Sequence, residues 1–131
     1  MKVAADTNVL VRAVVRDDKA QGEIAARLLR NAKLIAVAVP SLCELAWVLR
    51  RVYGFSATQL ATVIRALIAA GNVDVDRPAV AAGLAMLDAG GDFADGAIAY
   101  EGRWLGAETF VSFDKKAVEM LTAQGISARL L

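Results

Sequence analysis

Short apolar segments alternate with longer amphipathic segments along the whole chain, and this alternation limits the possible folds more than any other feature. The clearest apolar segment runs from Leu34 to Val39 and contains no polar residue. A continuous apolar run of this length is typical of a strand that is buried on both faces of a parallel sheet. The alternation therefore predicts an α/β fold, a three-layer sandwich with a mainly parallel central sheet flanked by helices.

The expected elements follow from the spacing of apolar residues and from turn residues. In the third helix, for example, Leu45, Val48, Leu49 and Val52 have the spacing of a core-facing stripe. The predicted strands are Lys2–Ala5, Leu34–Val39, Asn72–Val75, Thr109–Phe113 and Ile126–Leu130. The predicted helices are Thr7–Val15, Asp17–Ala32 (with Ile24 and Leu28 on one apolar face), Pro40–Tyr53, Ser56–Ala70, Arg77–Ala89, Asp92–Trp104 and Lys115–Gln124. Neither a repeat nor a linker interrupts them, so we expect one domain over residues 1–131.

Composition narrows the class of protein. Hydrophobic residues make up 57% of the 131 positions, which is enough for a buried core. Charges or turn residues break the apolar runs well short of the ~20 residues that span a bilayer. The single cysteine, Cys43, cannot form an internal disulfide, and we expect it to be a buried thiol. These features predict a soluble cytoplasmic protein.

The chain contains no histidine, which removes the usual general base and the usual zinc ligand. Any chemistry must therefore depend on carboxylates, hydroxyls, lysines or a hard metal ion. Fifteen basic residues accompany fourteen acidic ones. If Asp6, Glu44, Asp92, Asp95 and Asp114 form one acidic pocket, nine acids remain elsewhere, and the rest of the protein has a net charge of +6. A basic surface of this kind would suit binding of a nucleic-acid phosphate backbone. Ordinary solvated surface charge explains the same count.

Four acids occupy comparable positions next to predicted helix starts. Asp6 and Asp114 each follow a strand, whereas Glu44 and Asp95 are expected in the first turn of a helix, with Asp92 beside Asp95. Helix capping explains each of them singly. Asp6, Asp92 and Asp114 are good N-caps, Asp95 complements the helix dipole, and Ser41 to Glu44 has the pattern of a capping box.

Taken together, the acids favour a different explanation. Strand-to-helix junctions of an open parallel sheet lie along one edge, where ligands bind. Carboxylates that converge there repel one another unless protons or a cation neutralise them. Oxygen ligands select Mg²⁺ or Mn²⁺, and such ions activate water for attack on a phosphodiester. The pattern thus predicts a metal-dependent nuclease.

These motifs resemble those of the PIN-domain ribonucleases. The matching segments are Asp6-Thr7-Asn8, Ser41-Leu42-Cys43-Glu44-Leu45, Asp92-Phe93-Ala94-Asp95 and Ser112-Phe113-Asp114, and the resemblance covers essentially the whole chain. Within this family the chain looks like a VapC-type toxin of a type II toxin–antitoxin system. It departs from the family pattern at Gly96, where alanine is common.

The resemblance implies a set of functional residues and partners. It makes Asp6, Glu44, Asp95 and Asp114 the catalytic acids, with Mg²⁺ or Mn²⁺ bound there and at Asp92. It gives Asn8 and Ser112 supporting roles and implies an RNA substrate, a cognate antitoxin protein and a homodimer. Candidates for guiding RNA are Arg12, Arg16, Arg50, Arg51, Lys115 and Lys116. Trp47, Tyr53 and Phe55 are candidates for the antitoxin groove, for the dimer face or for the core.

Three other readings compete with this one. An aspartate-based phosphatase would need a second aspartate where Asn8 stands. A receiver domain would need an acidic pair near the start, where Asp6 is alone. A non-catalytic binding module on the same fold remains the alternative from a different class.

Overall fold

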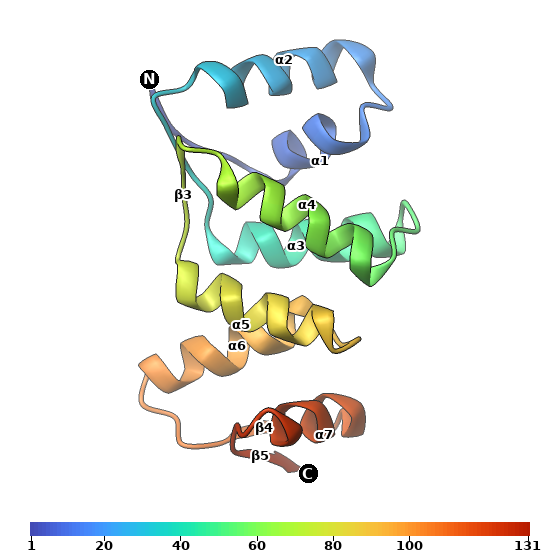
Figure 1. Ribbon diagram of the computed structural model, residues 1–131, viewed down its shortest axis with the longest axis vertical. Coiled ribbons are helices and arrows are strands. Elements are labelled where there is room, and N and C mark those ends of the chain that lie inside the picture. Colours follow the sequence, from blue (N-terminus) through green and yellow to red (C-terminus); the bar gives the residue numbers. More distant parts are fainter. The chain divides into compact units, whose positions relative to one another are not determined.

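The structure is a computed structural model that describes all residues from 1 to 131, and it consists of two compact units. The first unit comprises residues 1–76 and the second residues 77–131. Figure 1 shows the elements in chain order, coloured from blue to red. The expectation of a single domain stays a prediction.

The first unit contains three parallel strands and four helices. Strand β1 (Lys2–Ala4) pairs with β2 (Leu34–Ala36), and β2 pairs with β3 (Val73–Asp74), so the strand order is β1-β2-β3. The helices are α1 (Thr7–Val15), α2 (Lys19–Asn31), α3 (Val39–Arg51) and α4 (Ala57–Ala69). Parallel neighbours separated by helices are the βαβ arrangement that the alternation predicts.

Local sequence explains most of the helix ends in this unit. Asp18 caps α2 by accepting a hydrogen bond from the Gln21 backbone N–H at 3.0 Å. Ser56 and Gln59 form a reciprocal capping box at the start of α4. Arg16 ends α1 with φ 58°, a left-handed conformation that non-glycine residues adopt at a cost.

The apolar stripes in this unit are confirmed only in part. Leu45 and Leu49 of α3 are fully buried, whereas Val52, just beyond the helix, is 63% exposed. In α2, Leu28 is partly buried but Ile24 is 67% exposed, because Gly22, Ala25 and Ala26 form the buried face instead. Small residues let the two helices α1 and α2 approach closely. Cys43 is partly buried, so the expected buried thiol is wrong.

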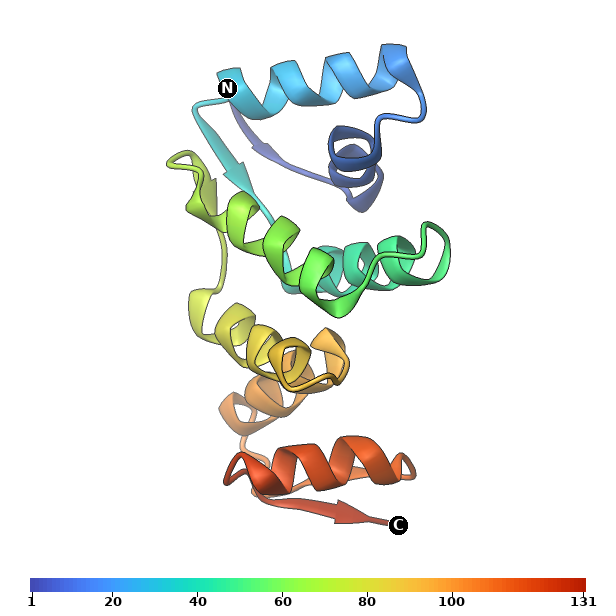
Figure 2. The same ribbon diagram turned by 45° about the vertical axis from the view of Figure 1, so that its right-hand side comes forward.

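The second unit contains two parallel strands and three helices. Strand β4 (Phe110–Ser112) pairs with β5 (Ala128–Leu130), and α7 (Lys115–Ala123) connects them. Helices α5 (Arg77–Asp88) and α6 (Phe93–Trp104) lie side by side in both views (Figures 1 and 2). Met86, Ala99 and Leu121, one from each helix, form a fully covered core cluster.

Every predicted helix and strand is present, with ends that differ by a few residues. All strand pairs are parallel, so the α/β class is confirmed. The strands form one sheet in each unit. No helix is long and apolar enough to cross a bilayer.

Candidate active site

Asp6 lies in a hollow of about 470 Å³ at the ends of the three strands of the first unit. It follows β1 and its carboxylate accepts a hydrogen bond from the Thr7 backbone N–H at 2.7 Å. Ser41 lines the same hollow, as do two acids that sequence reasoning missed, Asp74 and Asp76. Asp74 ends β3 (Val73–Asp74) and Asp76 lies two residues later, at the end of a strand that the sequence pattern does predict. The hollow matches the expected position of a ligand crevice at the carboxyl ends of parallel strands.

Glu44 is not in the position that sequence reasoning gave it. Helix α3 begins at Val39 with Ala38 as N-cap, no side chain caps it, and its first turn contains no acid. The predicted Ser41–Glu44 capping box is therefore wrong. The helix starts at Val39, one residue before the predicted Pro40, and Pro40 suits the first turn, where a backbone N–H is not needed. Glu44 lies in the second turn, exposed, and outside the residues that line the hollow. Capping thus does not explain Glu44.

Asn8 faces a different part of the first unit. It lines a hollow between α1 and α2 together with Arg12, Gln21 and apolar residues. It makes no hydrogen bond to Asp6 in the structure, so its bracing role stays a prediction.

The second unit brings Asp92, Asp95 and Asp114 around one small hollow of about 30 Å³, which Lys116 also lines. Asp92 is the N-cap of α6, but its carboxylate makes no capping hydrogen bond. Asp95 lies in the first turn of α6 as expected. Asp114 is a true cap, since its carboxylate accepts from the Ala117 N–H at 3.1 Å. Capping thus accounts for Asp114 and not for Asp92.

The surroundings of Asp95 disfavour its charged form. Partial burial raises the pKa of its carboxyl above the ordinary value of 3.8, and the negative charges of Asp92 and Asp114 raise it further. Asp95 makes no side-chain hydrogen bond that would offset this. A half-buried carboxylate beside two others is the environment that a bound cation would relieve.

Two neighbours hold the backbone around this acidic hollow. The Ser112 hydroxyl accepts a hydrogen bond from the Asp114 backbone N–H at 2.9 Å, which gives Ser112 a supporting contact. Lys116 Nζ donates to the Gly90 carbonyl oxygen at 3.0 Å, in the turn that leads to Asp92. Sequence reasoning missed this contact because Lys116 and Gly90 are 26 positions apart.

The other basic candidates have different surroundings. In the first unit Arg12 is paired with Asp17 at 2.8 Å and also bonds Gln21, so much of its charge is already engaged. Arg16, Arg50 and Arg51 are exposed. In the second unit Lys115 lies 3.9 Å from Glu119 in an exposed pair, which contributes little.

The three aromatic candidates also differ from one another. Trp47 is 60% exposed and is not part of the core. Tyr53 is partly buried and its hydroxyl donates to Asp17 at 2.9 Å. Phe55 is partly buried. Trp47 is therefore the only one of the three that offers a large free apolar surface.

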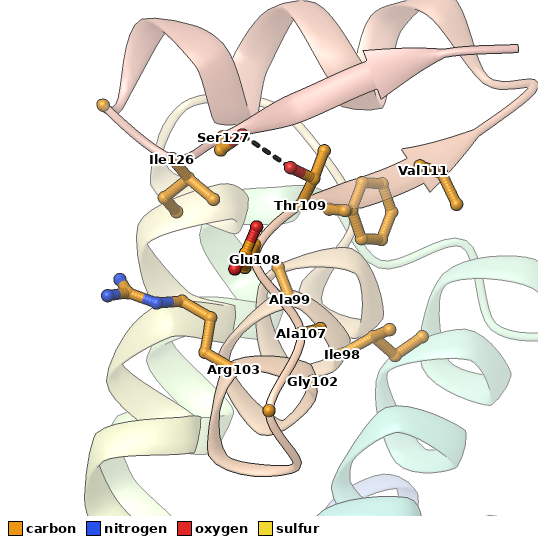
Figure 3. Close-up of a pocket in the computed structure, with 13 residues that line it drawn as sticks. Ile98, Ala99, Gly102, Arg103, Ala107, Glu108, Thr109, Val111, Ile126 and Ser127 are labelled. Carbon is orange, nitrogen blue, oxygen red and sulfur yellow. Dashed lines mark hydrogen bonds between the residues drawn. The ribbon is translucent and has the colours of Figure 1, made fainter.

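A larger hollow of the second unit lies elsewhere and is lined by none of the predicted acids. It measures about 700 Å³ and lies where α6, β4 and the start of β5 meet (Figure 3). Thr109 and Ser127 hydrogen-bond across it at 2.9 Å, and Ile98, Val111 and Ile126 supply apolar surface. The volume of a hollow therefore does not by itself identify the one that the predicted acids line.

The donors available in both units suit a hard divalent ion. They are carboxylate oxygens, and the chain has no histidine and a single cysteine. No three acidic, cysteine or histidine side chains in the structure stand close enough to hold one metal ion together. The chemistry of the donors therefore fits Mg²⁺ or Mn²⁺, while the structure itself contains no formed ligand shell.

A comparison with protein-family models decides the family. The model described as PIN domain matches residues 3–120, which is nearly the whole chain. The chain belongs to the PIN-domain family. No curated protein matches it. PIN domains are generally nucleases and typically use divalent metal ions.

The segment matched by the PIN-domain model includes all five predicted acids, Asp6, Glu44, Asp92, Asp95 and Asp114. Capping explains Asp6 and Asp114 locally. A shared catalytic role for the five acids stays a prediction. The phosphatase and receiver readings lose their basis, since the chain has a different fold family.

Proposed function

We propose that this PIN-domain protein is a metal-dependent endoribonuclease that acts as the toxin of a type II toxin–antitoxin system. The observation that carries the proposal is the acidic hollow of the second unit, lined by Asp92, Asp95 and Asp114, where burial and the charges of the other two acids raise the pKa of Asp95. Carboxylates that repel one another are stabilised when a divalent cation binds between them. The PIN-domain family, to which the chain belongs, consists generally of nucleases.

The proposed catalytic residues are Asp6, Glu44, Asp95 and Asp114, and Asp92 is a further metal ligand. Asn8 and Ser112 have supporting roles. When bound, Mg²⁺ or Mn²⁺ would lower the pKa of a coordinated water and stabilise charge on the phosphate. The carboxylates named above would hold the ion, and one that is not fully engaged with it would accept a proton from the attacking water.

The proposed partners are RNA, a cognate antitoxin protein and a second copy of this chain. The candidates for RNA contact include Arg16, Arg50, Arg51 and Lys116, which form no ion pair with an acid. Lys115 has only an exposed pair with Glu119, and Arg12 is a weaker candidate because Asp17 pairs with it. Trp47 is the candidate for antitoxin contact that the structure leaves most exposed.

The first experiment measures cleavage of labelled structured RNA with Mg²⁺, with Mn²⁺ and with a chelator. The variants are Asp6→Asn and Asp95→Asn, one from each unit. Asp18→Asn is a matched control, because asparagine also caps a helix and Asp18 is in neither acidic hollow. We expect metal-dependent cleavage that both test variants lose and the control keeps. Absence of cleavage together with absence of divalent binding by calorimetry would leave a non-catalytic binding module.

The toxin role needs a separate test in cells. Expression of the wild-type chain in a bacterial host should stop growth, and expression of Asp95→Asn should not. Co-expression of the reading frame adjacent to the toxin gene should restore growth if it encodes the antitoxin. Cleavage in vitro without growth arrest would keep the nuclease and remove the toxin role.

A further inference from the structure

The turn between α5 and α6 is the part of the second unit that leads directly to Asp92 and Asp95. Gly90 in this turn has φ 92°, which favours glycine. The backbone N–H groups of Gly90 and Gly91 donate to the carbonyl oxygens of Leu87 and Met86 at 2.9 and 2.7 Å. These two hydrogen bonds thus fix the turn against the end of α5.

Close packing against α7 also restricts the position of the turn. A Cβ added at Gly91 would lie 2.8 Å from the methyl carbon of Met120 in α7. Gly91 is buried although it lies in a turn. Helix α7, which begins after Asp114, is therefore packed directly against the segment that precedes Asp92.

Lys116 adds a polar link between the same two segments. Its side chain lines the hollow with the three acids, yet it forms no ion pair with any of them, and its ammonium donates to the Gly90 carbonyl oxygen at 3.0 Å. An exposed lysine beside three carboxylates would be expected to pair with one of them if charge alone decided its position. Its contact with a backbone carbonyl indicates that it holds the turn.

We propose that Lys116 is a positioning residue that ties the α5–α6 turn to the start of α7 and so keeps Asp92 and Asp95 close to Asp114. This inference rests on the proposed metal-dependent function and adds a residue to it. The bond joins the two segments that supply the acids of the second unit, one on each side of the hollow.

The first readout needs neither metal nor RNA. Amide hydrogen exchange of Gly90 and Gly91 in the full chain reports how often the turn opens. We expect Lys116→Met, which keeps the side-chain length and removes the donor, to speed exchange at both amides about fivefold. Lys116→Arg, which keeps a donor, should restore slow exchange. Lys115→Met is the matched control, because it removes a charge from the same turn of α7 and Lys115 contacts Glu119 instead.

The second readout separates positioning from charge. Calorimetry with Mn²⁺ alone should show about fivefold weaker binding to Lys116→Met and little change for Lys116→Arg. Loss of a nearby positive charge by itself would strengthen binding of a cation, which is the opposite direction.

Three results would overturn the proposal: unchanged exchange in Lys116→Met, equal acceleration in Lys115→Met, or tighter Mn²⁺ binding by Lys116→Met. If the wild-type chain binds no Mn²⁺, the proposed function fails, whereas the exchange result still decides the role of Lys116.

Discussion

The Cα atom of Gly96 in α6 lies so close to the Ala82 carbonyl of α5 that a Cβ at this position would be 2.2 Å from the oxygen. The family resemblance marks this position as one where alanine is common. The contact shows why glycine is present here. It lets two helices of the second unit approach closely, and the helix propensity lost with glycine is offset by packing.

Gly96→Ala should therefore destabilise the protein, although alanine favours helices. We expect a loss of about 1–3 kcal/mol in the free energy of unfolding, because the added methyl group meets backbone that cannot move aside easily. Gly102→Ala is the control in the same helix, since its Cβ would lie 3.9 Å from the nearest atom, Ala107 Cβ. Chemical denaturation should show it neutral or stabilised by up to about 1 kcal/mol. Equal effects of the two substitutions would contradict the close contact.

Asp114 has a capping role and a proposed catalytic role, and two substitutions separate them. Asp114→Asn should keep the capping hydrogen bond to the Ala117 N–H and lose RNA cleavage. Asp114→Ala should lose cleavage and also about 0.5–2 kcal/mol of stability. Thermal unfolding and a cleavage assay on both variants check this. Cleavage at the wild-type rate by a folded Asp114→Asn would leave Asp114 as a cap only.

Asp95→Asn should stabilise the metal-free protein at neutral pH while abolishing cleavage. Burial and the charges of Asp92 and Asp114 disfavour its carboxylate, and these effects outweigh the favourable dipole of the α6 N-terminus. Because the group is partly exposed, we expect the melting temperature to rise by only about 1–4 °C. The rise in melting temperature should be smaller when Asp92→Asn is also present, because that substitution already removes one of the repelling charges. A lower melting temperature for Asp95→Asn would show that the carboxylate has a stabilising partner.

Asp17 provides a pH-dependent contribution to stability in the first unit. The hydroxyl of Tyr53 holds the pKa of this carboxyl below its ordinary value of 3.8, and the guanidinium of Arg12 adds to the effect. A lowered pKa in the folded state means stability that is present above pH 3.8 and is lost as the pH falls through the folded-state value.

Tyr53→Phe should raise the pKa of Asp17 toward 3.8, which NMR titration of the carboxyl measures. The stability difference between wild type and Tyr53→Phe should be seen at neutral pH and fade in acid. In an Asp17→Asn background the Tyr53→Phe difference should be smaller at neutral pH. A difference that persists unchanged at low pH would mean that Tyr53 stabilises by packing alone.

Local patterns predicted the elements of this protein well. Leu34 to Val39 indicated a strand buried on both faces, but the strand ends at Ala36, and Ile35 and Val37 are buried whereas Ala36 and Ala38 are exposed, so one face only is buried. The pattern placed α3 one residue late at its start and two residues too far at its end. Patterns of spacing are local, so they recover elements better than their ends or their buried faces. Ile24 is exposed because small residues of α2 pack against α1 instead.

The sequence also identified the candidate acids, but not the reasons for their positions. Asp92, Asp95 and Asp114 were selected for their places next to helix starts, and the second unit brings them around one hollow. Asp74 and Asp76 were missed although the strand Asn72–Val75 was predicted, because only the pairing of β3 with β2 brings its end to the hollow of Asp6. A joint role for the acids of both units stays a prediction that the cleavage assay tests.

The sequence by itself determined the α/β class, the order of the elements, the family and the absence of histidine chemistry, since each depends on residue types and their spacing along the chain. Only the tertiary structure revealed that Gly96 meets Ala82, that Lys116 binds Gly90 and that burial and two other carboxylates raise the pKa of Asp95. The physical reason is that these effects depend on distances between segments far apart in sequence, which periodicity does not encode.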